Sequence, residues 1–247
     1  VYGSFKAYGS TYLVFSDYMR PAIRLAALMG VPTILLYSHD SIGVGPDGPT
    51  HQPVEHLASL RSIPGLKVYR PADAVEATEC WQLALTERSC PSVIVTSRQQ
   101  SDPVRRTHTD ENLCERGGYP VARGDSDQVI LFSSGSDVAH SLQAAEILRS
   151  HGIRAGVVSV PCVERFLEQD ERYRDDVLAS SRSVTRIAVE SAIDSGWSRW
   201  LGPGSHYIGM TGFGASGPGT TLFTHFGLDG EGIAGQVRAI LIQAARV

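Results

Sequence analysis

The stretch VPTILLYSHDSIGVGPDGPTHQPVEHLASLR, residues 31–61, joins an apolar run, a glycine-rich polar loop and a short segment of helical periodicity. The run VPTILLYS (31–38) is rich in Val, Ile and Leu without alternation, which is typical of a parallel strand covered on both faces. In VEHLASLR (54–61), apolar residues recur at the spacing of one helix face. A strand, a loop and a helix in this order predict a parallel α/β fold.

The same alternation continues after residue 61. LKVYRP (66–71) and PSVIVTS (91–97) are predicted to be two further buried strands. Between them, DAVEATECWQLALTER (73–88) opens with Asp73 and Glu76 at the spacing of a capping box. That spacing marks the start of a helix, so the first part of the chain predicts strands and helices in turn.

Residues 98–127 lose periodicity and gain charge, which favours a linker across the surface. The alternation then resumes, with predicted strands at 128–134, 153–160 and 184–190 and predicted helices at 136–152 and 231–247. We therefore predict an α/β fold of two three-layer domains with mostly parallel sheets. The opening residues VYGSFKAYGSTY (1–12) show no evident initiating structure. Because the sequence begins without Met, we expect a larger parent protein.

Composition narrows the class of protein. The 247 residues include 22 Lys and Arg against 26 Asp and Glu, and the cations are scattered, so neither a nucleic-acid-binding nor a membrane-surface patch is indicated. The four cysteines show no CxxC or Cys/His metal spacing, and we assign no metal ligands to this chain. With no secretory segment and no apolar run of membrane-spanning length, the sequence predicts a cytoplasmic protein.

The loop 39–53 concentrates titratable groups directly after the strand 31–38. In open parallel sheets, ligands bind beyond the carboxyl ends of the strands, which is where His39 falls. Asp47 could accept hydrogen bonds from sugar hydroxyls, and His51 could exchange a proton near neutral pH. The spacing equally allows that both histidines only support the loop.

Two further features could belong to the same site. Arg98 follows the strand 91–97, so we expect it at the same sheet edge as His39, where its guanidinium could bind a phosphate. Taken alone, an arginine in this position is more often a surface residue that opens a linker. Tyr12, Phe15 and Tyr18 recur every three residues, which places their rings on one face of a turn or short helix. They could line a flat heterocycle, although such a stripe more often belongs to a core.

Two glycine-rich stretches are predicted to be structural. SSGS (133–136) follows a strand but has neither the GxGxxG pattern nor a Walker lysine, which indicates an ordinary strand-to-helix turn. MTGFGASGPG (210–219) has no charged partner and is predicted to be a structural loop.

The run from YLVFSDYMR through SHDSIGVGPDGPTHQP to KVYRPAD (12–73) resembles transketolases, the thiamine-diphosphate enzymes that move two-carbon ketol units between sugar phosphates. The similarity continues through VTSRQ, RGGYPVARG, SSGSDV, VVSVP, AVE and GMTGFG, so it spans essentially the whole chain. It implies an N-terminally incomplete pyrimidine-binding domain at 1–100, a linker at 101–119 and the transketolase C-terminal domain at 120–247.

The resemblance also implies a role for each candidate residue. Phe15 matches the ring that stacks on the aminopyrimidine of thiamine diphosphate, and Tyr12 and Tyr18 match the rings beside it. His51 matches a histidine near the reacting carbonyl and the cofactor's amino group. In the implied mechanism it acts together with His39 in proton transfer and orientation.

The substrate ligands follow from the same resemblance. His39 and Arg98 match ligands of the substrate phosphate, and Asp47 matches a residue that binds a sugar hydroxyl. The loop departs from the family at Pro46, where an acidic residue is common. Pro46 fixes its own φ and removes a negative charge beside the substrate, which could change substrate preference or loop stiffness.

Parts of the family's site are missing from this sequence. The glutamate that activates the cofactor and the diphosphate-binding domain, whose GDG motif and Asn hold Mg²⁺ or Ca²⁺, are not found. We therefore expect the chain alone to be inactive and to need an N-terminal half or subunit, in a homodimer or a heterotetramer. The alternatives are a subunit of a split enzyme that acts on a specialised sugar and a non-catalytic assembly partner.

Overall fold

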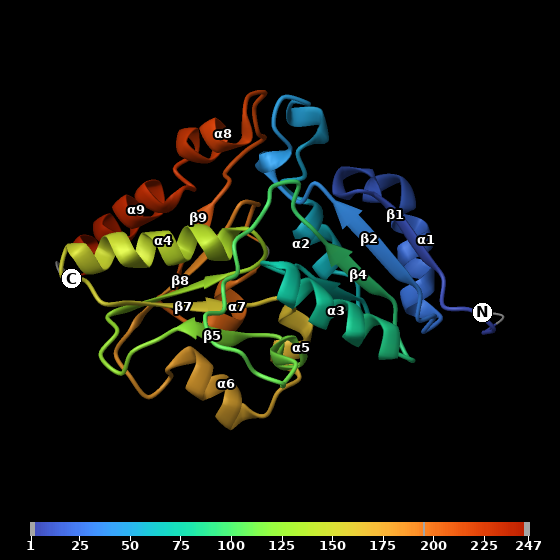
Figure 1. The fold of residues 1–247 in the computed structure, drawn as a ribbon, viewed down its shortest axis with the longest axis horizontal. Helices are drawn as coiled ribbons and strands as arrows, with labels where there is room; N and C mark the ends of the chain where they lie inside the picture. Colours follow the sequence, from blue (N-terminus) through green and yellow to red (C-terminus); the bar gives the residue numbers. More distant parts are fainter. Residues whose placement is uncertain (1–2, 195, 245–247) are drawn as a thin grey trace.

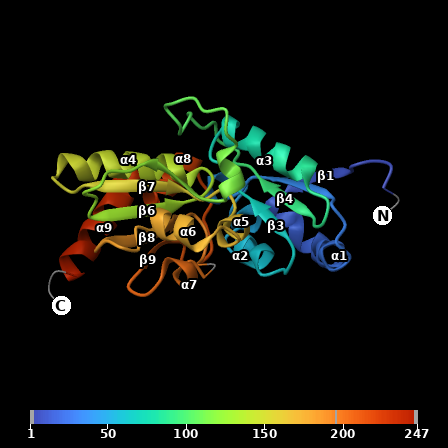
Figure 2. The ribbon, with the colours of Figure 1, turned by 90° about the horizontal axis from the view of Figure 1, so that it is seen from below.

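The computed structural model describes residues 3–194 and 196–244, which form two α/β halves arranged in a row (Figures 1 and 2). The first half contains a four-stranded, wholly parallel sheet of order β1-β2-β4-β3. Its strands are β1 (Tyr8–Tyr12), β2 (Ile34–Ser38), β3 (Lys67–Tyr69) and β4 (Ser92–Val95). Its helices are α1 (Ser16–Leu28), α2 (His56–Arg61) and α3 (Ala74–Thr86).

Successive residues of β2 enter different cores, as the pleat of a strand requires. Leu35 and Tyr37 pack with the α1 and α2 side chains, whereas Ile34 packs with Cys80 and Leu83 of α3. Figure 2 shows the result: α3 covers one face of the sheet, and α1 and α2 cover the other. A strand covered on both faces must be apolar at every position, which explains the unbroken apolar run in the sequence.

The second half contains a five-stranded sheet of order β5-β7-β6-β8-β9, in which only β5 is antiparallel. Its strands are β5 (Tyr119–Ala122), β6 (Val129–Ser133), β7 (Ala155–Ser159), β8 (Thr185–Glu190) and β9 (His206–Gly209). Its helices are α4 (Asp137–Ser150), α5 (Val163–Leu167), α6 (Glu171–Leu178), α7 (Ser198–Leu201), α8 (Gly219–His225) and α9 (Gly230–Ala244). Helices α4 and α9 pack on one face of the sheet, and α5, α6 and α7 pack on the other.

The predicted α/β class is confirmed, and so are the central strands and long helices. Asp73 caps α3 by accepting a hydrogen bond from the Glu76 amide at 2.8 Å, as the sequence predicted. The Glu76 side chain, however, turns to the Ala72 amide and to the second domain. Of the predicted closing helix, residues 245–247 lie outside the described range.

Short elements at the edges of both sheets were missed by the predictions from the sequence. The opening segment contains β1, which pairs with β2, so the prediction of no initiating structure was wrong. Residues 98–127 were predicted to be a linker, but they contain a 3-10 helix (Leu113–Arg116) and the strand β5. Tyr119, the first residue of β5, is also the last residue of the linker 101–119 that the family resemblance implied. Cys114 and Tyr119 are buried there. Short edge strands carry weak periodicity, because few of their residues face a core.

The two sheets meet at their carboxyl edges. Asp40 and Arg70, which follow β2 and β3, contact Ser136 and Asp137 after β6. Residues that follow strands of both sheets therefore gather at one domain interface. Within the described residues, no helix combines the length and the apolar character needed to cross a membrane.

Candidate active site

The predicted site residues converge at the carboxyl edge of the first sheet. Tyr12 ends β1 opposite Ser38, the last residue of β2, so His39 emerges beside it. The next strand is β4, in which Val95 pairs with Tyr37 of β2. Arg98 follows three residues later. The prediction that His39 and Arg98 share one sheet edge is thereby confirmed.

The aromatic residues form a continuous cluster with both histidines. Tyr12 stacks on His39, with ring centroids 3.7 Å apart and planes inclined by 20°. Phe15 lies 5.9 Å from Tyr12 in a stacked arrangement, 6.2 Å from Tyr18, and 5.6 Å from His51 edge to face. Aromatic pairs at such distances contribute about 0.5–1.5 kcal/mol each beyond their buried area.

The cluster is not part of the hydrophobic core. Tyr12 and Phe15 are half-buried and Tyr18 is 85% exposed, whereas the neighbouring Leu13 is fully buried. The alternative that this stripe packs inside the domain is therefore wrong. The rings instead lie partly exposed at the sheet edge, where a flat heterocycle could stack.

His39 has a backbone conformation that is unusual for a residue with a side chain. Its φ is 64°, in the left-handed region, which costs on the order of 1 kcal/mol or more; such strained residues cluster at functional sites. Its Nδ1 lies 2.8 Å from the Ser38 hydroxyl. The strain has to be balanced by contacts of neighbouring residues.

The surroundings of His39 lower the pKa of its imidazole and so favour the neutral form. Partial burial lowers its pKa below the ordinary 6.5, and the Arg98 guanidinium lowers it further, while Asp47 and Asp40 act in the opposite direction. The structure thus brings His39, Arg98 and Asp47 within electrostatic reach of one another. Arg98 and Asp47 are exposed, and the Arg98 guanidinium also donates a hydrogen bond to the Val44 carbonyl.

The loop 39–53 is held by an amide side chain that the sequence did not single out. The Gln52 amide group donates to the carbonyls of Ile42, Gly45 and Ala215 at 3.2, 3.3 and 2.8 Å. A Cβ on Gly214 would lie 1.7 Å from Gln52 Oε1, so this close approach requires glycine. Loop 39–53 is therefore fixed from the second domain.

The stretch 210–219 is a structural loop, as predicted, and it also holds the loop 39–53 of the candidate site in place. Besides accepting the bond from Gln52, it supplies Ser216, whose hydroxyl donates to the Pro46 carbonyl at 2.9 Å. His51, at the end of the short 3-10 helix Pro49–His51, lies 3.0 Å from the Thr50 hydroxyl through Nδ1. Glycine content alone gave no sign that these two loops would meet.

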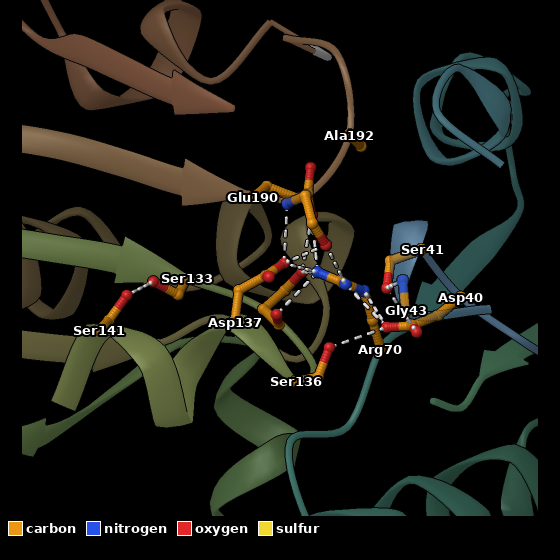
Figure 3. A network of polar contacts seen from close by, with 12 residues as sticks. Asp40, Ser41, Gly43, Arg70, Ser133, Ser136, Asp137, Ser141, Glu190 and Ala192 are labelled. Atoms are coloured by element: carbon orange, nitrogen blue, oxygen red, sulfur yellow. Dashed lines mark hydrogen bonds and ion pairs between the residues drawn. The ribbon is translucent and has the colours of Figure 1, made fainter. Parts of the chain in front are cut away.

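Sequence reasoning also missed a buried ionic network at the domain interface (Figure 3). Its charged members are Asp40, Arg61, Arg70, Asp137 and Glu190. The stretch SSGS, predicted to be only a turn, contributes hydroxyls of Ser134 and Ser136 to this network. In the sequence these charges lie far apart, so no local spacing could have indicated them.

A thiamine-type cofactor fits one part of this arrangement. The partly exposed rings beside His51 suit an aminopyrimidine ring, and the exposed Arg98 suits a phosphate-bearing substrate. The described residues could therefore contribute a stacking surface to a cofactor site. Among residues 3–194 and 196–244, no group of three or more His, Cys, Asp or Glu side chains could hold a metal ion.

Comparison with known proteins agrees with this geometry. The family model of the transketolase pyrimidine-binding domain matches residues 1–103, and that of the transketolase-like C-terminal domain matches residues 117–229. The chain is 50% identical to the transketolase of Cereibacter sphaeroides over 94% of its own length, and 50% identical to that of Sinorhizobium medicae over 99%. It covers 35% of each relative, so it spans about a third of their length.

Solved structures give the same result. The transketolase from Leishmania mexicana superimposes with a TM-score of 0.89 at 38% identity, covering 97% of this chain and 34% of that one. A split-gene transketolase described as an inactive β4 tetramer shares the fold, with a TM-score of 0.77 at 21% identity, and 76% of that chain is covered. The chain therefore belongs to the transketolase family, of which it carries the pyrimidine-binding and C-terminal domains.

Proposed function

We propose that this chain forms one wall of the active site of a thiamine-diphosphate-dependent transketolase, which moves a two-carbon ketol unit from a ketose phosphate to an aldose phosphate. The observation that carries the proposal is the convergence of partly exposed aromatic rings, two histidines, Asp47 and Arg98 at one sheet edge. A purely structural subunit has no physical need for this combination.

The aromatic cluster is assigned to the cofactor. Phe15 would stack on the aminopyrimidine, with Tyr12 and Tyr18 as flanking rings, and His51 would lie beside the reacting groups. When bound, thiamine diphosphate supplies the nucleophilic carbon that such carbon–carbon bond cleavage requires. The half-buried His51 would lie within reach of the reacting groups as a proton donor or acceptor.

The polar residues are assigned to the sugar phosphate. Arg98 supplies a positive charge and a two-pronged donor for the phosphate. Partial burial and Arg98 lower the pKa of His39, which favours a role as a hydrogen-bonding group more than as a positive charge. Asp47 is exposed beside them and can accept hydrogen bonds from sugar hydroxyls.

We assign the rest of the active site to a diphosphate-binding half, which would come from the same protein or from another subunit. Helix α1 leaves apolar side chains uncovered, with Leu25, Leu28 and Met29 53%, 72% and 54% exposed. Leu25 and Leu28 lie near the C-terminal end of α1, which carries Tyr18 in its first turn, and Met29 follows the helix as its C-cap. Exposed apolar area of this kind favours burial by a partner, in a homodimer or heterotetramer, and that partner would hold the Mg²⁺ or Ca²⁺. The four cysteines are unpaired and buried, which suits a reducing cytoplasm.

The first experiment compares Arg98→Ala with wild type in the assembled enzyme. Loss of charge-assisted hydrogen bonds should raise the KM for a phosphorylated acceptor about tenfold to a hundredfold, with little change for an unphosphorylated aldehyde. Arg106→Ala is the matched control, because Arg106 is also an exposed arginine but pairs with Glu146 of helix α4 and not with the loop 39–53. An unchanged KM for the phosphorylated acceptor in Arg98→Ala would remove the phosphate assignment.

A second experiment separates the remaining alternatives. The chain alone should show no ketol transfer, and activity should appear when a diphosphate-binding half is supplied. The solved split-gene transketolase shows that a chain of similar extent can be a subunit of its own, so the native partner should be identified by intact mass. Absence of turnover with any sugar in the complete assembly would favour the non-catalytic role.

A further inference from the structure

Asp40, the residue after His39, is almost completely buried and fixed from several directions. Its Oδ2 accepts hydrogen bonds from Arg70 Nε and Nη2 at 3.1 and 2.7 Å and from the Ser136 hydroxyl at 3.2 Å. Its Oδ1 accepts from the Ser41 hydroxyl at 3.0 Å. A carboxylate held this firmly leaves the backbone on its N-terminal side little freedom.

Arg70 links this carboxylate to the second domain. Its side chain is fully buried, and Nη1 donates to Asp137 Oδ2 at 2.6 Å and to the Ser134 carbonyl at 2.7 Å. Figure 3 shows the guanidinium between Asp40 on one side and Asp137 and Glu190 on the other. A rigid, planar group therefore joins the start of the loop 39–53 to the strand ends of the second sheet.

The backbone of Arg70 is held as well. Its amide donates to the Pro161 carbonyl at 2.8 Å, and its carbonyl accepts from the Gly135 amide at 2.9 Å. Glu190 completes the network through a two-pronged pair with Arg61, at 2.8 and 2.9 Å. Both arginines are thus oriented by groups that the second domain supplies.

Stability alone does not account for such an arrangement. Buried ion pairs often contribute no more to stability than apolar side chains of similar volume, whereas they do enforce one geometry. The charged residue of this network that adjoins the site, Asp40, directly follows the strained His39. The network therefore ends at the backbone position whose conformation needs support.

We propose that Arg70 and Asp40 are positioning residues, through which the second domain holds the backbone and imidazole of His39 in the orientation that binds the substrate phosphate. This inference rests on the proposed function of His39. The second domain would then shape the site through this network as well as through its contacts with the loop 39–53. None of the network residues of the second domain is placed against the substrate.

The test uses Asp40→Ala and the conservative Asp40→Asn in the assembled enzyme. In Asp40→Ala, Arg70 keeps Asp137 and Glu190, so the charges of the two arginines stay balanced. We expect His39 to leave its left-handed backbone conformation in a crystal structure. We expect the ratio of KM for a phosphorylated acceptor to KM for an unphosphorylated aldehyde to rise about tenfold. Asp40→Asn keeps an oxygen acceptor and should restore most of the wild-type ratio.

Two further variants separate positioning from general weakening of the interface. Ser136→Ala removes one donor to Asp40 from the second domain and should raise the ratio by a smaller factor. Glu76→Gln is the matched control, because Glu76 is a buried carboxyl at the same interface that binds Tyr119 and Ser159. It should leave the ratio unchanged.

The inference is overturned if His39 keeps its conformation in Asp40→Ala, or if Glu76→Gln shifts the ratio equally. Failure of the proposed function has a different signature. In that case wild type would show no preference for the phosphorylated acceptor, while the crystal structure of Asp40→Ala would still decide whether Asp40 holds His39.

Discussion

The turn between β6 and α4 offers a sharp test of how tightly the domain interface is packed. Gly135 has φ +58°, and a Cβ built there would lie 2.6 Å from Arg70 Cγ and 2.7 Å from Arg70 Nε. Arg70 cannot move aside easily, because its three guanidinium nitrogens all donate to buried acceptors. Gly135→Ala therefore combines backbone strain with a clash against a fixed side chain.

The two contributions can be estimated separately. Alanine in the left-handed region costs about 1 kcal/mol relative to glycine, and overpacking of a close-packed interior costs about 1–3 kcal/mol. We expect Gly135→Ala to lower the free energy of unfolding by about 2–4 kcal/mol, measured by urea denaturation followed through tryptophan fluorescence.

Gly152 provides the matched control. Its φ is +77°, but no atom lies within 4 Å of the position that a Cβ would take. Gly152→Ala should therefore lose only the strain of about 1 kcal/mol. Equal losses in the two variants would refute the reasoning, since they would mean that Arg70 yields to the new methyl group without cost.

Three other predictions concern charge and the loop 39–53. Burial alone would raise the pKa of Glu190, but Arg61 and Arg70 outweigh it and hold the pKa at about 2 against an ordinary 4.5. Its stabilising effect should be complete above pH 4.5 and lost towards pH 2. The stability gap between wild type and Glu190→Gln should shrink by about 3 kcal/mol in that range of urea denaturation curves. Arg98→Gln should raise the pKa of His39 and Asp47→Asn should lower it, as NMR titration of the imidazole would show. A shift of the His39 pKa in the same direction in both variants would contradict the assigned effects of the two charges. Gln52→Leu leaves buried carbonyls without a donor, so we expect a loss of about 1–3 kcal/mol and faster proteolysis within the loop.

The candidate site was more accessible to sequence reasoning than the interface behind it. His39 and Arg98 could be paired from the sequence because each directly follows an apolar run, and parallel strands end at a common edge. Tyr12, Phe15 and Tyr18 could be grouped by their spacing, although spacing alone favoured a core. Their exposure, and their contacts with the two histidines, became evident only in three dimensions.

Sequence periodicity determined the α/β class, the central strands and the main helices of this protein, because burial on both faces of a sheet leaves a continuous apolar signal. Tertiary structure decided what joins the two domains. Asp40, Arg70 and Glu190 are separated by 30 to 150 positions along the chain, yet one guanidinium contacts both carboxylates. Such contacts follow from how the two sheets meet at their carboxyl edges, and no local pattern records where distant strand ends come together.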